Sequence, residues 1–123
     1  MLDGQAVIAS IPLQAAFDDP NAGLTLYPVD LGAGQGIRDL AAVDGGLLVL
    51  SGPQKDMTGA ANVSFWKPGM NKPSSYNIEK AGLADSKPEA LTVLKAADDR
   101  YSVLVVSDGP QNGAPALYDI PRQ

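Results

Sequence analysis

The sequence predicts an all-β fold of antiparallel strands, and two observations lead to that prediction. The apolar runs are short, rich in Val, Ile and Leu, and separated by Gly, Pro, Asn and Asp. The 13 glycines and 10 prolines among 123 residues favour many tight turns over long helices. A chain of this length ordinarily forms one domain. We therefore treat residues 1–123 as a single all-β domain.

Each apolar run bounded by turn residues is expected to form one strand. The expected strands are Gln5–Leu13, Leu24–Leu31, Ile37–Val43, Leu47–Ser51, Asn62–Lys67, Ser75–Glu79, Glu89–Leu94, Ser102–Ser107 and Ala116–Ile120. Asp44-Gly45-Gly46 predicts a tight antiparallel hairpin, because glycine readily supplies positive φ angles. Lys87–Ala97 is also compatible with a helix, since proline is tolerated in a first helical turn. We favour a strand there because of the internal repeat.

The internal repeat has a period of about 50 residues, which is typical of one β-propeller blade. Leu24–Val43 aligns without a gap on Ser74–Val93, and this alignment places Asp39 on Glu89. Later segments keep the same order of apolar strand, Gly-Pro-Gln turn and aromatic strand. They pair Leu47–Ser51 with Val103–Ser107, and Phe65–Lys67 with Leu117–Asp119.

The fold we predict is therefore a set of antiparallel four-stranded propeller-type blades that form an incomplete ring. The blade-like units are approximately 5–31 (partial), 37–80 (complete) and 87–121 (partial). The alternative is a β-sandwich in which the similarity arose by chance. Propellers usually close with about 4–8 blades, and open sheet edges favour association. We therefore expect either self-association or the remainder of a longer chain as the partner.

Three segments resemble a bacterial family of unknown function whose members are predicted or seen as β-propellers. These segments are Gly36–Ala41, Gly46–Pro53 and Lys87–Leu91, and the similarity extends over about Leu24 to Tyr118. The resemblance implies a propeller-like fold and no established activity.

Composition excludes several classes of function. The net charge is −5, and the 9 Lys and Arg residues do not cluster. Nucleic acid and anionic membrane surfaces are therefore not expected as partners. The chain has no Cys and no His, which rules out histidine-based triads and Cys or His zinc sites. No transmembrane run or signal peptide is evident, so we expect a soluble protein of unknown compartment.

Asp39, Glu89 and Asp108 are the candidate metal ligands. If the first two lie on innermost strands of adjacent blades, their carboxylates converge, and Asp108 follows the next strand. Carboxylate oxygens suit Ca²⁺. Pro88-Glu89 also resembles the Pro-Glu-Gly of calcium-dependent lactonase-like and phytase-like propellers, with Ala90 in place of Gly. The alternative is structural: Asp39 pairs with Arg38 or Lys87, or accepts backbone N–H bonds at a blade junction.

These residues support two main hypotheses about function. The first is a non-catalytic scaffold or binding module, because no pair of nucleophile and base is evident. The alternative is a Ca²⁺-dependent hydrolase of esters, lactones or phosphates, in which a bound cation polarises the scissile group and a carboxylate acts as base. A third hypothesis is an interaction module that self-associates through open blade edges. We favour a non-enzymatic role for this chain by itself, with no catalytic residue assigned.

Overall fold

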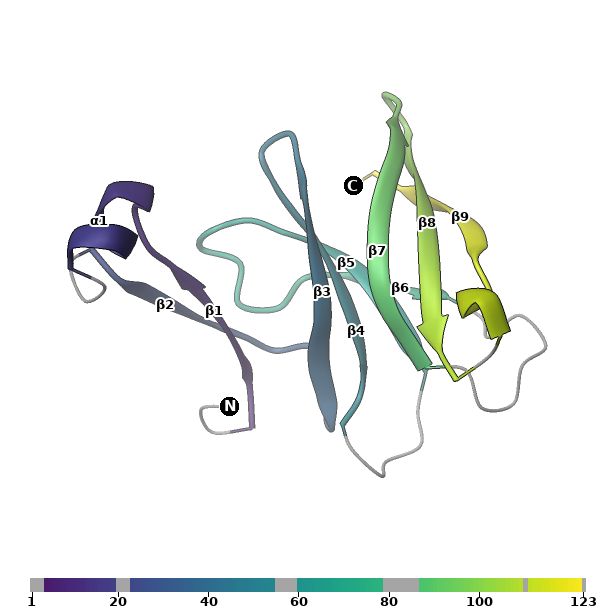
Figure 1. Cartoon of the computed structure of the whole chain (residues 1–123), viewed down its shortest axis with the longest axis horizontal. Helices are drawn as coiled ribbons and strands as arrows, with labels where there is room; N and C mark the ends of the chain where they lie inside the picture. The colour runs from purple at the N-terminus through teal and green to yellow at the C-terminus, as the bar shows by residue number, and fades with distance from the viewer. Residues whose placement is uncertain (1–3, 20–22, 55–59, 79–86, 110, 123) are drawn as a thin grey trace.

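In the computed structural model of the protein, which describes residues 4–19, 23–54, 60–78, 87–109 and 111–122, the chain forms three antiparallel sheets (Figure 1). The N-terminal sheet pairs β1 (Ala6–Ser10) with β2 (Thr25–Val29). The middle sheet has the order β3 (Gln35–Val43), β4 (Gly46–Pro53), β5 (Ala61–Trp66), β6 (Ser75–Ile78). The C-terminal sheet has the order β7 (Lys87–Ala96), β8 (Arg100–Asp108), β9 (Ala116–Pro121). Two short helical segments are α1 (Leu13–Asp18) and the 3-10 turn η1 (Gln111–Gly113).

The prediction of an all-β, antiparallel fold is confirmed, and every expected strand overlaps an observed one. Lys87–Ala96 forms β7 and not a helix, because its backbone pairs with β8 along its whole length. The Asp44-Gly45 hairpin joins β3 to β4 as expected, and Gly45 has a φ of 79°. The predicted end of one strand, Glu79, lies outside the described residues.

The first expected strand, Gln5–Leu13, is too long. The strand β1 ends at Ser10, and Leu13–Asp18 forms α1 instead. Pro12 precedes this helix with a φ of −58°, and proline is tolerated there because its missing N–H is not needed. The segment that follows is Leu-Gln-Ala-Ala-Phe, in which Ala, Leu and Gln are good helix formers. Gln14 also donates a hydrogen bond to Asp18 one turn later, at 2.8 Å.

The middle sheet is buried on both faces, which explains the continuous apolar run in β4. On one face, Leu48, Leu50 and Val63 pack against Val103 and Val105 of the C-terminal sheet. Alternate residues of a strand point to opposite faces of its sheet, so Val49 packs on the other side. The sequence of β4 therefore shows no alternation of apolar and polar residues.

The other face of the middle sheet packs against the N-terminal sheet. Val49 and Trp66 lie in one cluster with Ile8 and Val29. The rings of Tyr27 and Trp66 meet edge to face, with centroids 5.3 Å apart and an interplanar angle of 68°. The Trp66 indole N–H donates to the Met70 carbonyl at 2.9 Å. This second cluster holds the β1–β2 hairpin on the rest of the molecule.

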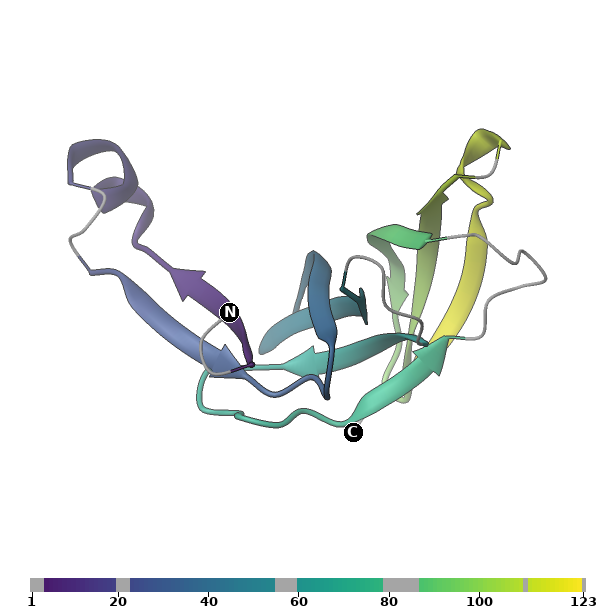
Figure 2. The same cartoon turned by 90° about the horizontal axis from the view of Figure 1, so that it is seen from below.

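Figure 2 shows the three sheets following one another along an arc, in the order of the sequence. The first strands of the middle and C-terminal sheets, β3 and β7, lie toward the concave side of the arc, and β6 lies on the convex side. Within the described part of the chain, no helix is long and apolar enough to cross a membrane.

Candidate functional site

The predicted site lies where β3 of the middle sheet meets β7 of the C-terminal sheet. Asp39 lies on β3 and Glu89 on β7, and these two strands contact each other although they belong to different sheets. Each strand is also the first strand of its sheet, so one of its edges has no neighbour in the ladder. Backbone groups along such an edge need partners from outside the sheet.

Asp39 supplies one of those partners. Its Oδ2 accepts a hydrogen bond from the Leu91 backbone N–H of β7 at 2.7 Å. Its Oδ1 accepts one from the Leu40 N–H at 2.9 Å. Asp39 is half-buried, and both of its oxygens already accept hydrogen bonds. The carboxylate therefore connects two sheets through the backbone, which is one of the structural roles considered for it from the sequence.

Glu89 faces a cation. Its Oε1 forms an ion pair with Arg38 Nη1 at 2.9 Å, and the two side chains are 39% and 25% exposed. Arg38 also donates from Nη2 to the carbonyl of Pro53 at the end of β4. The guanidinium thus contacts the middle sheet and the C-terminal sheet together. From the sequence, Arg38 was considered as a partner for Asp39, and the structure pairs it with Glu89.

The strand ladders explain this pairing. In the middle sheet Ile37 pairs with Ser51 and Asp39 pairs with Leu50, so the ladder passes over Arg38 as a bulge residue. A β-bulge inserts one residue that has no partner on the neighbouring strand. The side chain of Arg38 is therefore positioned by an irregularity in β3.

The C-terminal sheet has a bulge at the corresponding place. Pro88 pairs with Ser107 and Ala90 pairs with Val106, so the ladder passes over Glu89. Glu89 therefore occupies the ladder position of Arg38, and Ala90 occupies that of Asp39. The ungapped alignment that places Asp39 on Glu89 is one residue out of register here.

Asp108 stands apart from the contacts made by the other two candidates. It is the exposed last residue of β8, and its Oδ1 accepts a hydrogen bond from the Gly109 N–H at 2.9 Å. No group of three or more His, Cys, Asp or Glu side chains that could hold a metal ion occurs among the described residues. Calcium binding by Asp39, Glu89 and Asp108 stays a prediction. In the structure each of these carboxylates interacts with a protein group.

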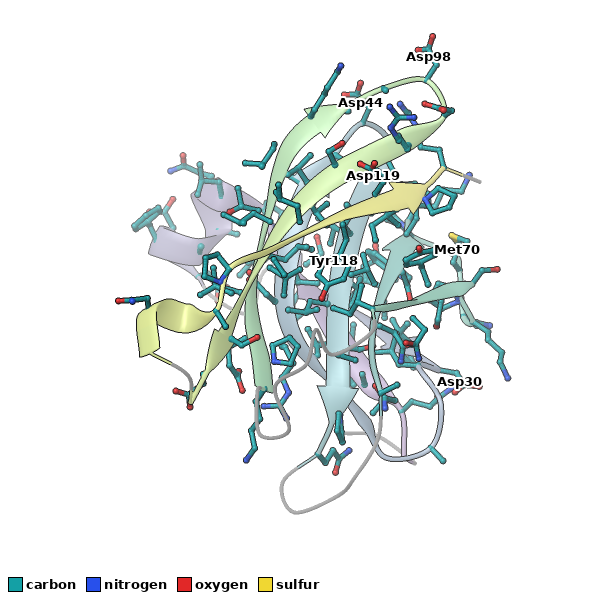
Figure 3. The ribbon with its side chains drawn as sticks, turned by 90° about the vertical axis from the view of Figure 1, so that its right-hand side faces the viewer. Asp30, Asp44, Met70, Asp98, Tyr118 and Asp119 are labelled. Carbon is teal, nitrogen blue, oxygen red and sulfur yellow. The ribbon has the colours of Figure 1, made fainter. Side chains whose placement is uncertain are left out.

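Asp30 is a carboxylate that the sequence did not single out. It follows β2, and its Oδ1 accepts a hydrogen bond from the Gly32 N–H at 2.9 Å. Its Oδ2 lies 3.4 Å from Lys72 Nζ, in the segment between β5 and β6. The Gly32 hydrogen bond, followed by the charge of Lys72, lowers the pKa of Asp30 below its usual value. Figure 3 shows Asp30 at the lower right of the view, far from Asp44 and Asp98, which lie on hairpin tips at the top.

We expect Asp30→Asn to lower the free energy of unfolding at neutral pH. At low pH, where Asp30 is protonated, the variant and the wild type should have similar free energies of unfolding. A carboxyl whose pKa is lower in the folded state stabilises the fold above its unfolded pKa, and this contribution disappears as the pH falls through the folded value. Urea unfolding of both proteins at a series of pH values between 7 and 2 measures the difference.

Lys72→Gln is the matched control for that experiment, because it leaves the Gly32 hydrogen bond in place. Lys72→Gln should lose less of the pH-dependent part of the free energy of unfolding than Asp30→Asn does. The reason is that the Gly32 hydrogen bond is the larger cause of the lowered pKa of Asp30. Curves for both variants that run parallel to the wild type at every pH would show that Asp30 does not have a lowered pKa.

Comparison with known families gives one match. Residues 11–115 match the model of DUF3616, which is described as a protein of unknown function. The chain belongs to the DUF3616 family. No curated protein and no solved structure matches this DUF3616 chain. The family is described as one of unknown function, which agrees with the family resemblance found in the sequence.

Proposed function

We propose that this DUF3616 chain is a non-catalytic scaffold or binding module built from propeller-type blades. The arrangement of the sheets supports the blade interpretation over a β-sandwich. A sandwich buries one face of each of two sheets, whereas here the middle sheet is covered on both faces by sheets that precede and follow it in the sequence. The sheets extend over residues 6–29, 35–78 and 87–121, close to the three expected units.

The registers of the ladders also support this interpretation. Leu48 pairs with Phe65 in the middle sheet, and Leu104 pairs with Leu117 in the C-terminal sheet. Leu48 is thus equivalent to Leu104, and Phe65 to Leu117. These are the same matches that the sequence alignment gave for the two segments. The first strands of these two sheets, β3 and β7, also carry a bulge near their starts. Two sheets whose first three strands share their order, the register of these pairs and this bulge are what duplicated units would produce.

The observation that carries the non-catalytic part of the proposal is the use of the candidate carboxylates in contacts between sheets. Asp39 accepts the Leu91 N–H, and Glu89 pairs with Arg38. A general base needs a carboxylate that can reach a substrate proton. These two carboxylates instead connect the middle sheet to the C-terminal sheet, which suits a rigid module that presents a surface.

The test compares Asp39→Ala with Asp98→Ala, a carboxylate on the exposed β7–β8 turn. We expect Asp39→Ala to lower the free energy of unfolding by about 1–3 kcal/mol, because the Leu91 N–H loses a charged acceptor. Asp98→Ala should change it by less than about 0.5 kcal/mol. Urea unfolding followed by circular dichroism measures both changes.

The wild type, Asp39→Ala, Glu89→Ala and Asp98→Ala are then assayed for hydrolysis of p-nitrophenyl acetate, p-nitrophenyl phosphate and γ-butyrolactone, with and without Ca²⁺. The proposal expects rates equal to the buffer blank and no heat on calorimetric titration with Ca²⁺. Turnover by the wild-type protein that disappears in Asp39→Ala and Glu89→Ala would overturn it in favour of the calcium-dependent hydrolase.

A further inference from the structure

One face of the C-terminal sheet is apolar and packs against no other sheet within the described residues; η1 covers only its Val106 end, where Gly113 lies against the Val106 side chain. Thr92, Leu104 and Leu117 form one row across its three strands, with Ala90 and Val106 in the adjacent row. Leu117 is 70% exposed. The next row is polar: Ser102 donates to Asp119 at 2.6 Å, and Arg100 lies 3.8 Å from the same carboxylate. The C-terminal open face is thus an apolar area bordered by charge.

The corresponding face of the middle sheet packs against the next sheet in the sequence. Leu48 and Leu50 occupy the ladder positions of Leu104 and Val106, and both are fully buried against the C-terminal sheet. The residue at the position of Leu117 is Phe65, which packs against the same cluster. In this chain, therefore, that face is covered by the sheet that follows. Among the described residues, no sheet covers the same type of face on the C-terminal sheet.

The N-terminal sheet has the complementary open face, which no other described sheet covers. Ala6, Ile8 and Val29 point toward the middle sheet, so Val7, Leu26 and their ladder neighbours point away from it. This N-terminal open face consists of Val7, Ala9, Leu26 and Pro28, and Leu26 is 50% exposed. In the middle and C-terminal sheets, the face on this side is covered by the sheet that precedes it.

We propose that the C-terminal open face of one copy binds the N-terminal open face of a second copy of the same chain. This inference rests on the proposed propeller-type arrangement, because it extends the order of sheets seen within the chain. Each junction inside the chain joins one sheet to the next through these same two types of face, so the contact between copies would continue an existing interface.

The number of copies follows from the arithmetic of ring closure. One copy provides three sheets in its described residues, and propellers usually close with about 4–8 blades. Two copies reach that range, with about six sheets, and a third copy would exceed it. The expected assembly is therefore a dimer in which both head-to-tail junctions are identical and the two open faces of the described residues are both covered. Since the faces are apolar, salt should weaken the dimer little.

Light scattering after size-exclusion chromatography tests the proposal with the purified full chain. The wild type is expected to have the mass of two copies. Leu117→Glu and Leu26→Glu, on opposite open faces, should each give the mass of one copy with an unchanged circular dichroism spectrum. Leu13→Glu is the matched control, because Leu13 is 79% exposed on α1 and outside both faces. This control should remain dimeric.

Mixing the two variants distinguishes head-to-tail pairing from other kinds of dimer. A mixed pair has one junction with both variant residues and one with neither, so the mixture of Leu117→Glu and Leu26→Glu should recover the mass of two copies. A monomeric wild type overturns the proposal and leaves the open faces to another polypeptide. A dimer that both variants preserve, or a mixture that stays monomeric, also overturns it. None of these results affects the proposed non-catalytic role, which is tested separately by the Asp39 variants.

Discussion

Leu50→Ala is expected to lower the free energy of unfolding by about 2–5 kcal/mol. Leu50 is fully buried on the face of the middle sheet that packs against the C-terminal sheet. The change removes buried methyl groups and leaves a cavity among Leu48, Val63 and their neighbours, and strands on both sides of the junction cannot easily collapse into it. The effect should therefore exceed that of any single hydrogen bond between the two sheets.

Leu13→Ala is the matched control for this prediction, since the same atoms are removed from a side chain that is 79% exposed. We expect this control to stay within about 0.5 kcal/mol of the wild type. Urea unfolding followed by circular dichroism compares the two variants at equal protein concentration. Equal stabilities for Leu50→Ala and Leu13→Ala would mean that the middle and C-terminal sheets are not packed as described.

The sequence predicted the strands well because the apolar runs are short and the turn residues between them are distinctive. The Asp44-Gly45 hairpin is an example, since few other residues tolerate the positive φ of Gly45. The sequence did not predict α1, because its apolar residues continue the run that forms β1. What separates the helix from the strand is Pro12, whose side chain prevents continued pairing.

The candidate site was predicted only in part. The alignment identified the correct strands and the correct region, but it matched Asp39 with Glu89. The two ladders instead place Arg38 and Glu89 at equivalent bulge positions in their sheets. Both first strands carry the bulge, so it does not itself cause the shift of one residue, and nothing in the residue types at this place marks the correct register. An alignment shifted by one residue would have placed opposite charges at matching positions. That shift would have predicted the ion pair across the junction.

The contact between Arg38 and Glu89 also explains how two similar sheets can be joined in a fixed register. Apolar packing between faces has no preferred direction, so sliding of one sheet along another is opposed mainly by polar contacts. Here the Asp39–Leu91 hydrogen bond and the Arg38–Glu89 ion pair lie side by side at the same junction. The carboxylates that suggested a metal centre thus have a structural role that the geometry accounts for.

Trp66→Ala is expected to lower the free energy of unfolding by about 3–5 kcal/mol. Trp66 is 3% exposed, and it is the residue through which the middle sheet contacts Tyr27 of the N-terminal sheet. Removing the indole eliminates the edge-to-face contact, the hydrogen bond to the Met70 carbonyl and the apolar packing of the largest side chain in this cluster. The β1–β2 hairpin should then lose much of its support.

Amide hydrogen exchange locates this loss, because protection should fall first in β1 and β2 and least in β8. Trp66→Phe is the matched variant: it keeps an aromatic ring against Tyr27 and removes the N–H donor to Met70. It should therefore retain most of the stability. Circular dichroism is the appropriate probe, since Trp66 is the single tryptophan of the chain and fluorescence would be lost with it. A uniform loss of protection in all three sheets would show that the hairpin does not depend on Trp66 more than the other sheets do.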